Sequence, residues 1–277
     1  MNKPVLIRQV WASNLEAEFR HIRNTITRFP VISMDTEFPG VIYAPNFDPA
    51  IPYYLRNIEP SEQYKFLKKN VNDLKLIQLG LTLSDGRGNL PDLGTGCCYV
   101  WEFNFSDFDP ENDPRNQDSV DLLRRQGIDF NRNLSYGVDS KRFAQLMETS
   151  GLLYKESVVW VTFHSAYDFG YLVKVLTQRD LPDQLEDFLK ELTRLFGRNV
   201  FDMKHVMKFC NSLYGGLERV ATTLNVKRAI GRSHQAGSDS LLTWQAFKKM
   251  LDIYFVDNQH NNLDKHAGVL FGLEIAA

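Results

Sequence analysis

Apolar residues near the start of the chain recur with helical spacing and then give way to a β-rich run. Leu15, Phe19 and Ile22 follow one another at three- or four-residue intervals, which predicts a helix over residues 13–30. The next segment, VISMDTEF, is rich in β-branched and apolar residues and predicts a strand over residues 31–38.

Three further segments have the composition of strands. LKLIQLGLTL, residues 74–83, and CCYVWEFNF, residues 97–105, flank a glycine-rich turn region, so we expect them to pair as an antiparallel hairpin. SVVWVTFHS, residues 157–165, is almost entirely apolar, which is typical of a central strand covered on both faces.

Helical patterns dominate the rest of the chain, after a loop rich in proline, asparagine and aromatic residues over 39–60. Helices are predicted over residues 62–69, 118–127, 140–151, 166–177, 185–196, 206–210, 217–224 and 238–254. Strands of meander type, followed by a strand among many helices, predict an α/β domain with a mixed central sheet flanked by helices. This order differs from an alternating βαβ nucleotide-binding fold. Because no composition break divides the chain, we expect a single domain over residues 1–277.

The composition is that of an ordinary soluble globular protein, with 43% of the 277 residues hydrophobic and 24% charged. The formal net charge of −2 argues against a basic protein that wraps duplex nucleic acid. Three cysteines, of which Cys97 and Cys98 are adjacent, provide neither a disulfide framework nor the spacing of structural zinc. No apolar run approaches the roughly 20 residues that span a bilayer, and the first residues lack the apolar stretch of a signal peptide. We therefore expect an intracellular, soluble protein with no membrane partner.

Two carboxylates lie at the end of the first predicted strand. Asp35 and Glu37 are two positions apart, so they point to the same face of the strand, where they repel each other. Such a pair is either exposed decoration of a sheet edge or part of a cation site. The apolar neighbours Val31, Ile32 and Met34 indicate burial on at least one face, which favours the cation site.

Two other segments place acids at a strand end or a helix start. Asp168 follows the most apolar strand, inside FHSAYDFGYL, and Asp239 lies in the first turn of the last predicted helix, five positions after His234. Taken singly, each acid is also an ordinary helix-terminus residue. Together with Asp35 and Glu37 they provide four carboxylates and one histidine, the donors that two hard divalent cations such as Mg²⁺ require.

A site of this composition has a defined chemistry. Two ions roughly 4 Å apart clamp the attacking and leaving oxygens of an in-line phosphoryl displacement, and a histidine can accept the proton of the attacking water. Two divalent ions also reverse the sign of the formal charge of −2 and make the cavity attractive to phosphate. Without metal, the acids repel one another, and at least one should titrate at a raised pH.

Three other polar residues have structural explanations. Asp202 follows a short apolar run and imitates a fifth metal ligand, but we expect it to be a helix cap. His205 is expected to be structural. His164, four residues before Asp168, either lines the cleft or caps the end of the strand.

Three motifs carry a resemblance to a known family. MDTEFPG, FHSAYDFGYL and HQAGSDSLLT resemble the exonuclease motifs of the DEDD superfamily, and the residues around them are similar to those of the Pop/CCR-associated-factor deadenylases, catalytic subunits of the CCR–NOT complex. The resemblance continues through VWASNLEAEFRHIR, LIQLGLTL and QDSVDLLRRQGIDF and covers nearly the whole chain. It implies a ribonuclease H-like α/β fold and a 3′-to-5′ exoribonuclease that shortens the poly(A) tails of messenger RNA and releases 5′-AMP.

The resemblance also implies roles for individual residues. The four metal-binding acids of the superfamily match, in chain order, Asp35, Glu37, Asp168 and Asp239. The histidine before the last acid matches His234. By analogy Asp35 bridges both ions, Glu37 and Asp239 complete the site nearer the nucleophile, and Asp168 serves the second ion. Two Mg²⁺ ions are expected as cofactors, with Mn²⁺ as the alternative.

Contacts to single-stranded RNA are expected from aromatic and basic residues near the acids. Phe38, directly after the acids, and Phe169, directly after Asp168, can wall the terminal nucleotide. Phosphate contacts are expected from the basic residues near His234, namely Arg232, Arg228 and Lys227. Core phenylalanines and a solvated charge run are the alternative explanations, and the preference for adenine rests on the family.

The family resemblance implies partners as well as a substrate. Single-stranded poly(A) RNA, the NOT scaffold subunit and a CCR-type deadenylase are expected, in the cytoplasm, including processing bodies, and in the nucleus. One departure concerns the scaffold: Glu148, in LMETSG, stands where the family has a hydrophobic residue in its docking helix. Two rival functions stay open, a non-catalytic adaptor with the same fold and a DEDD exonuclease that acts on DNA or on very short oligonucleotides.

Overall fold

The computed structural model describes residues 3–46, 58–256 and 262–275. These residues form one six-stranded sheet in the spatial order β1-β4-β3-β2-β5-β6. The strands are β1 (Val5–Val10), β2 (Val31–Glu37), β3 (Gln78–Ser84), β4 (Cys98–Asn104), β5 (Val159–Thr162) and β6 (Val200–Asp202). β2, β3 and β4 pair antiparallel, whereas β1 joins β4, β5 joins β2 and β6 joins β5 in parallel. The sheet is therefore mixed, as the order of segments predicts.

Helices surround the sheet and differ from the predicted ones mainly at their ends. They are α1 (Leu15–Thr25), α2 (Pro60–Asp73), α3 (Gln117–Arg125), α4 (Phe130–Tyr136), α5 (Ser140–Glu148), α6 (Ala166–Thr177), α7 (Leu185–Phe196), α8 (Met203–Val206), α9 (Leu217–Thr223) and α10 (Ala236–Tyr254). The segment predicted as a helix over 206–210 is instead the end of α8 followed by a 3₁₀ turn, Met207–Phe209. Among the described helices, none is both long and apolar enough to cross a membrane. Most of the loop expected over 39–60 lies outside the described residues.

Among the described residues, β1, β6 and α4 escaped prediction, and each has a local reason. β1 is an edge strand in which polar Arg8 and Gln9 interrupt the apolar run, so its pattern is weak. β6 has only three residues, and α4 has seven, which is too short for a helical period to stand out. Both are held by their neighbours in the fold, because β6 completes the sheet beside β5 and Phe130 of α4 packs in a small buried cluster.

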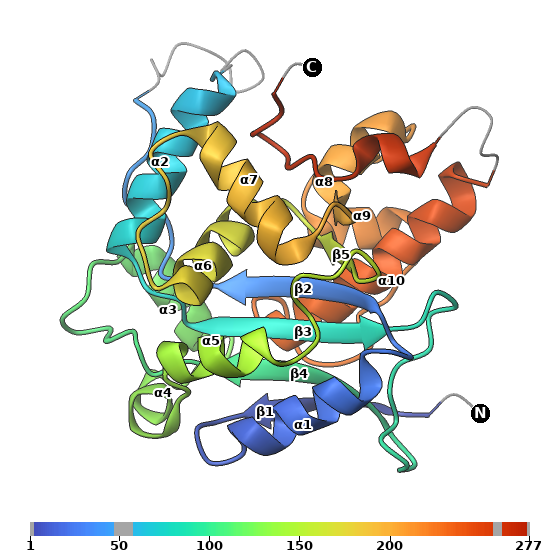
Figure 1. The fold of residues 1–277 in the computed structure, drawn as a ribbon, viewed down its shortest axis with the longest axis horizontal. Coiled ribbons are helices and arrows are strands. Elements are labelled where there is room, and N and C mark those ends of the chain that lie inside the picture. The colour runs from blue at the N-terminus through green and yellow to red at the C-terminus, as the bar shows by residue number, and fades with distance from the viewer. Residues whose placement is uncertain (1–2, 47–57, 257–261, 276–277) are drawn as a thin grey trace.

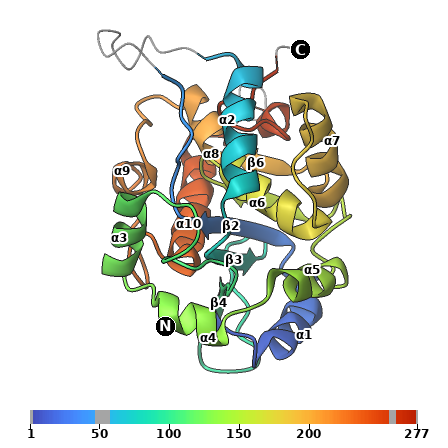
Figure 2. The ribbon, with the colours of Figure 1, turned by 90° about the vertical axis from the view of Figure 1, so that its left-hand side faces the viewer.

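Two hydrophobic cores lie on opposite faces of the sheet. One side is covered by α1, α5, α6 and α7, and the other by α10 with α9, as the two views show (Figures 1 and 2). Phe19, Trp101 and Phe143 belong to the first core. Leu242 and Phe247 of α10 belong to the second. Helix α10 thus lies against the middle of the sheet, on β2 and β3. The position of its first turn sets the position of Asp239.

Strand β2 divides its side chains between the two faces. Ile32 and Met34 are buried in the first core. Because side chains alternate along a strand, Asp35 and Glu37 point to the opposite face, on which α10 packs. The charge pair at the end of the strand is therefore directed toward the start of α10.

Gly80 of β3 allows α10 to approach the sheet so closely. A Cβ atom at Gly80 would lie 1.9 Å from the carbonyl oxygen of Ala236, the first residue of α10. Backbone atoms cannot move aside as a flexible side chain can, so this position accepts only glycine. The contact places the first turn of α10 directly over β3, beside the acids of β2.

Candidate active site

The four predicted acids come from three elements that meet at one end of the sheet. Asp35 and Glu37 end β2, Asp168 lies in the first turn of α6, directly after β5, and Asp239 lies in the first turn of α10. β5 runs parallel to β2, so the helix after β5 begins beside the end of β2. The structure thus brings together residues that are more than two hundred positions apart in the sequence.

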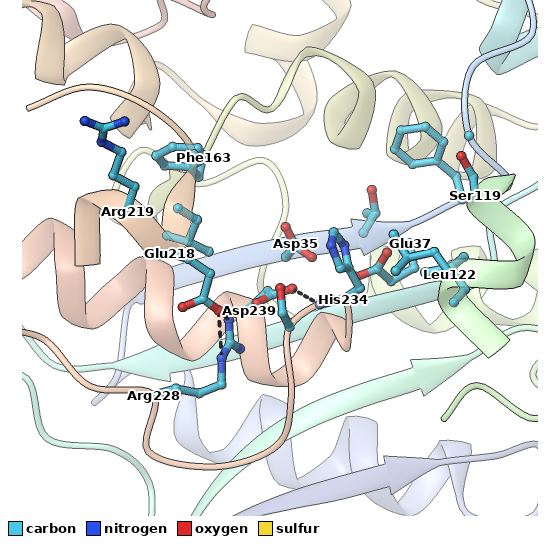
Figure 3. Close-up of a pocket in the computed structure, with 17 residues that line it drawn as sticks. Asp35, Glu37, Ser119, Leu122, Phe163, Glu218, Arg219, Arg228, His234 and Asp239 are labelled. Carbon is cyan, nitrogen blue, oxygen red and sulfur yellow. Dashed lines mark hydrogen bonds and ion pairs between the residues drawn. The ribbon is translucent and has the colours of Figure 1, made fainter. Parts of the chain in front are cut away.

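A cavity of about 600 Å³ opens at these acids. Asp35, Glu37, His234 and Asp239 lie at its centre, as Figure 3 shows. The walls come from α3 on one side and from the end of β5 and α9 on the other, through Ser119, Leu122, Phe163, Leu217 and Arg219. The walls were not predicted, because α3 and α9 reach the acids only through the tertiary fold.

Asp168 lies behind the cavity rather than in its wall. It is only 7% exposed, and Thr36 donates to its Oδ1 twice, from the backbone nitrogen at 2.8 Å and from Oγ1 at 2.6 Å. These two hydrogen bonds attach the Asp168 side chain of α6 to Thr36, which lies between Asp35 and Glu37 on β2. Thr36 thus holds the Oδ1 atom of Asp168 through both of its donors.

Asp239 has a partner at each oxygen. Arg228 donates from Nη2 to Oδ1 at 2.6 Å, and the backbone nitrogen of His234 donates to Oδ2 at 2.7 Å. His234 has a backbone φ of 59°, in the left-handed region that a non-glycine residue rarely occupies. The bond to Asp239 stabilises this conformation and holds the exposed His234 at the cavity.

Burial raises the pKa of every acid in the site. The pKa of Asp35 lies well above its ordinary range because of burial and then because of the charges of Asp239, Asp168 and Glu37. The pKa of Glu37 is raised for the same two kinds of reason. Burial raises the pKa of Asp168 to about 7, although the hydrogen bonds from Thr36 oppose the change.

The pKa of Asp239 is also raised by burial, but its neighbours limit the rise. The guanidinium of Arg228 and the backbone N–H of His234 both favour the charged carboxylate. Four mutually repelling acids with one neighbouring arginine form an environment that a cation stabilises.

The donor chemistry fits a hard divalent cation. One ligand atom each of Glu37, His234 and Asp239 can be chosen so that the three lie within 4.8 Å of one another. Carboxylate oxygens are the donors that Mg²⁺ and Mn²⁺ prefer, whereas an imidazole nitrogen suits softer transition metals, so Glu37 and Asp239 are the expected ligands and His234 their neighbour. Asp35 and Asp168 are outside this three-residue group, so the bridging role expected for Asp35 stays a prediction.

The residues predicted to contact substrate have different fates. Phe38 lines the cavity, and its ring packs against Tyr167 and Tyr171 at centroid distances of 5.3 and 4.9 Å. The prediction for Phe169 is wrong, because its ring is fully buried and packs against Phe196 in the core. A helix turns by about 100° per residue, so Phe169 points away from the side on which Asp168 meets β2.

Of the basic residues near His234, Arg228 lies in the cavity wall and the other two are exposed to solvent. Arg228 lines the cavity and is tied to Asp239, Glu218 and Ser238. Lys227 and Arg232 lie exposed on the same loop, and the backbone nitrogen of Arg232 donates to Gln235. Phosphate contacts by Arg232 stay a prediction.

Asp202 is a cap, as predicted, and its carboxylate joins three segments. It accepts from the backbone nitrogens of His164, Ser165, Lys204 and Phe271 at distances between 2.8 and 3.1 Å. His164 thus sits at the strand end, with its ring edge-on to Phe271. The Asp202 carboxylate therefore stabilises the turn that precedes α6 and Asp168.

A mixed α/β sheet with four acids at the strand ends and helix starts defines the ribonuclease H-like DEDD exonuclease fold, as expected. The chain belongs to the CAF1 family of ribonucleases, whose family model matches residues 10–150. It is 49% identical to Arabidopsis thaliana probable CCR4-associated factor 1 homolog 7, over 98% of this chain and 94% of that protein. It is 43% identical to the poly(A) ribonuclease pop2 of Schizosaccharomyces pombe, over 90% of this chain and 70% of that protein.

Solved structures agree with the sequence relatives. S. pombe Pop2p in its Mg²⁺- and Mn²⁺-bound form superposes with a TM-score of 0.84 at 40% identity, over 96% of this chain and 99% of that one. A chain from the structure of the yeast NOT1 MIF4G domain co-crystallised with CAF1 gives 0.76 at 31% identity, over 96% of both chains. Exonuclease I, at 12% identity and a TM-score of 0.52 over 80% of this chain and 40% of that one, shares the fold alone.

Proposed function

We propose that this protein is a 3′-to-5′ exoribonuclease that shortens poly(A) tails of messenger RNA and releases 5′-AMP with the help of two divalent metal ions. The observation that carries the proposal is the convergence of Asp35, Glu37 and Asp239 at one cavity, with His234 beside them and Asp168 directly behind. The name of the S. pombe relative, a poly(A) ribonuclease, supports RNA and adenine as the substrate. The Mg²⁺- and Mn²⁺-bound form of Pop2p supports the metals.

The four acids would hold the ions. Ions held there would supply positive charge to the phosphate and to the attacking and leaving oxygens. Thr36 keeps Asp168 in place through two hydrogen bonds, and His234 and Arg228 do the same for Asp239. The protein thereby presents its carboxylates in a fixed arrangement before substrate arrives, which lowers the cost of reorganisation during the reaction.

His234 is the proton acceptor in this proposal. It is exposed at the cavity, next to Glu37 and Asp239, where a water that attacks the terminal phosphate can reach its ring. The water oxygen bonds to phosphorus, the bond from phosphorus to the 3′ oxygen of the preceding nucleotide breaks, and that oxygen takes up a proton. The released nucleotide keeps the phosphate at its 5′ position, and the shortened RNA regains a 3′ hydroxyl.

The walls of the cavity fit a terminal nucleotide. The Phe38 ring is held by Tyr167 and Tyr171 and offers a rigid aromatic surface to a base or ribose. Phe163 and Leu122 provide apolar walls on opposite sides. The choice of adenine over other bases is proposed from the relative's name.

The proposal extends to a place in the CCR–NOT complex. The match to CAF1 crystallised with the NOT1 MIF4G domain supports a NOT scaffold as partner, and a CCR-type deadenylase is proposed with it. Glu148, the residue that departs from the expected docking pattern, is exposed at the end of α5. We propose cytoplasmic and nuclear sites of action, including processing bodies.

A gel-resolved assay tests the proposal. Purified protein is incubated with Mg²⁺ or Mn²⁺ and RNA of one sequence tailed with A, U or C, and the products are separated at single-nucleotide resolution. Stepwise shortening of the A-tailed RNA with AMP release, stopped by EDTA, is expected. Equal activity on a DNA of the same length would favour a DNA exonuclease, and silence in both metals would favour the adaptor.

A further inference from the structure

A buried carboxylate outside the acidic site lies under the start of α10. Glu102 of β4 is only 3% exposed. Strand register places Gln9, Glu102, Gly80 and Asp35 in one row across β1, β4, β3 and β2. Residues in one row point to the same face of a sheet, so Glu102 and Asp35 face α10 together, with Gly80 between them.

The first turn of α10 uses Glu102 in place of a capping side chain. The first N–H groups of a helix have no partner within it, and Gln235, the residue before α10, makes no side-chain cap. The backbone nitrogen of Gly237 instead donates to Oε2 of Glu102 at 2.9 Å. A Cβ at Gly237 would lie 3.0 Å from the Cβ of Glu102, so the glycine lets the strand side chain come this close.

The other oxygen of Glu102 is held by the sheet. Oε1 accepts from Nε2 of Gln9 at 2.8 Å and from Nε2 of Gln78 at 3.4 Å. Gln78 in turn donates to Asn104 at 2.7 Å, and its Oε1 lies 3.4 Å from the nitrogen of Ala236. Side chains of the two flanking strands, β1 and β3, therefore hold the Glu102 carboxylate, and that carboxylate holds the first turn of α10.

We infer that Glu102 is a positioning residue that sets the place of Asp239 by holding the first turn of α10. Asp239 comes two residues after Gly237 in that turn, and His234 is bonded to Asp239 from the loop before it. Glu102 touches neither the cavity nor the reacting atoms; it acts through the backbone of α10. The expected effect of Glu102 on turnover rests on the function proposed above. Its effect on the first turn of α10 rests on the hydrogen bond to Gly237 alone.

Three variants at this position separate positioning from general packing. Glu102→Met fills a similar volume without an acceptor, and Glu102→Ala removes the side chain as a second test if the methionine fits badly. Glu102→Gln keeps one oxygen that accepts from the Gly237 nitrogen, while its amide nitrogen faces the Nε2 donors of Gln9 and Gln78, so it is the partial rescue variant. The matched control is Glu18→Ala, because Glu18 is also 3% exposed and bonds Arg8 and Trp101, the residues next to Gln9 and Glu102. Glu18 lies on α1, against the opposite face of the sheet.

Hydrogen exchange of the metal-free protein is the first measurement. We expect amides 236–239 to exchange roughly tenfold faster in Glu102→Met, because losing a helix cap costs about 1 kcal/mol. In Glu102→Gln, which keeps the acceptor for Gly237 and loses those for Gln9 and Gln78, the rate should lie between wild type and Glu102→Met. Glu18→Ala should lower the melting temperature and leave these amides unchanged. Equal exchange at 236–239 in wild type and both Glu102→Met and Glu102→Ala would overturn the inference.

Binding of Mn²⁺ and steady-state kinetics on oligo(A) complete the test. Glu102→Met should weaken Mn²⁺ binding and lower kcat at least tenfold with little change in KM, whereas Glu18→Ala should match wild type per folded molecule. A wild type that never cleaves oligo(A), together with altered exchange in Glu102→Met, would reject the proposed function and keep the positioning role. Altered activity without altered exchange or Mn²⁺ binding would reject the positioning role alone.

Discussion

Arg228 lies against Asp239, with its Nη2 atom 2.6 Å from the carboxylate Oδ1. Both side chains are largely withdrawn from solvent, at 15% and 9% exposure, so the pair is more than a surface contact. Arg228 also donates to Glu218 and Ser238, which fixes the guanidinium from two more directions. An arginine therefore already compensates part of the negative charge that the site gathers.

Removing Arg228 should destabilise the protein most when metal is absent. Arg228→Gln leaves a buried carboxylate without its cation, and we expect a loss of about 2 kcal/mol in the free energy of unfolding in EDTA. Saturating Mn²⁺ should restore much of the loss, because the ion supplies positive charge at the same acids. Urea unfolding in EDTA and in Mn²⁺ measures the loss and its recovery. Arg232→Gln, on the same exposed loop, is the control, and its free energy of unfolding should change by no more than about 0.5 kcal/mol. Equal losses in the two variants would contradict the role of the pair.

Removing a site acid should abolish activity and spare the fold. Asp239→Ala or Asp35→Ala should lower AMP release from A-tailed RNA by at least about a thousandfold, because several kcal/mol of charge stabilisation are lost. Asp121→Ala, which removes an exposed acid of nearby α3, should retain wild-type activity. Circular dichroism and the melting temperature check that each variant is folded. Full activity of either site variant would reject the proposed function.

The metal-free protein should lose stability as pH rises. The pKa of Asp168 is raised from its ordinary 3.8 to about 7, so between these values the folded state holds a proton that the unfolded chain has released. The contribution of Asp168 to stability is complete below its ordinary pKa of 3.8 and is lost as pH rises through its folded-state pKa of about 7. Urea unfolding in EDTA should therefore give a smaller free energy at about pH 8 than at about pH 5.

Asp168→Asn provides the control for that pH dependence. Its side-chain oxygen still accepts the two bonds from Thr36, and the residue does not titrate. The stability of this variant should fall less steeply over the same pH range. Parallel curves for wild type and Asp168→Asn would show that Asp168 is not the group responsible.

Metal stoichiometry should distinguish the roles of the acids. Calorimetric titration with Mn²⁺ should give two sites in wild type, one in Asp168→Ala and weak or no binding in Asp35→Ala, if Asp35 serves both ions. A single site in wild type would remove the two-ion part of the proposal. Bound metal should also stabilise the fold by about 2.7 kcal/mol at a hundredfold excess over Kd.

Glycine at position 80 should be essential for the approach of α10. In Gly80→Ala the new methyl group collides with backbone atoms of Ala236, and we expect a loss of about 1–3 kcal/mol in stability together with lower kcat. Gly96→Ala is the matched control, because nothing lies within 4 Å of a Cβ placed there. Wild-type activity in Gly80→Ala would mean that α10 can shift without disturbing Asp239.

The sequence predicted those parts of the protein in which one segment carries its own signal. The pair Asp35 and Glu37 was recognisable because it ends an apolar strand, and Asp239 because it starts a long periodic helix. β1 was missed because its pairing with β4 depends on residues ninety positions away. The roles of these acids rest on their grouping in space, which only the tertiary fold supplies.

Sequence adjacency was a poor guide within the site. Phe169 follows Asp168 directly and was assigned to the substrate, yet the helix turns it into the core. Arg228 and Arg232 are equally basic, and only the contacts of the fold distinguish the cavity residue from its exposed neighbour. Glu102 had no signal at all, because its partner Gly237 lies on another element and offers a backbone atom.

The carboxylate of Asp202 links two segments of the chain that are distant in sequence. It joins the turn before α6 to the nitrogen of Phe271, near the end of the described chain. Any partner, fusion or cleavage that pulls Phe271 away would remove one of the bonds that hold this turn, and the disturbance would reach Asp168 three residues later. A segment about a hundred residues further along the chain is thus bonded to the turn that precedes Asp168.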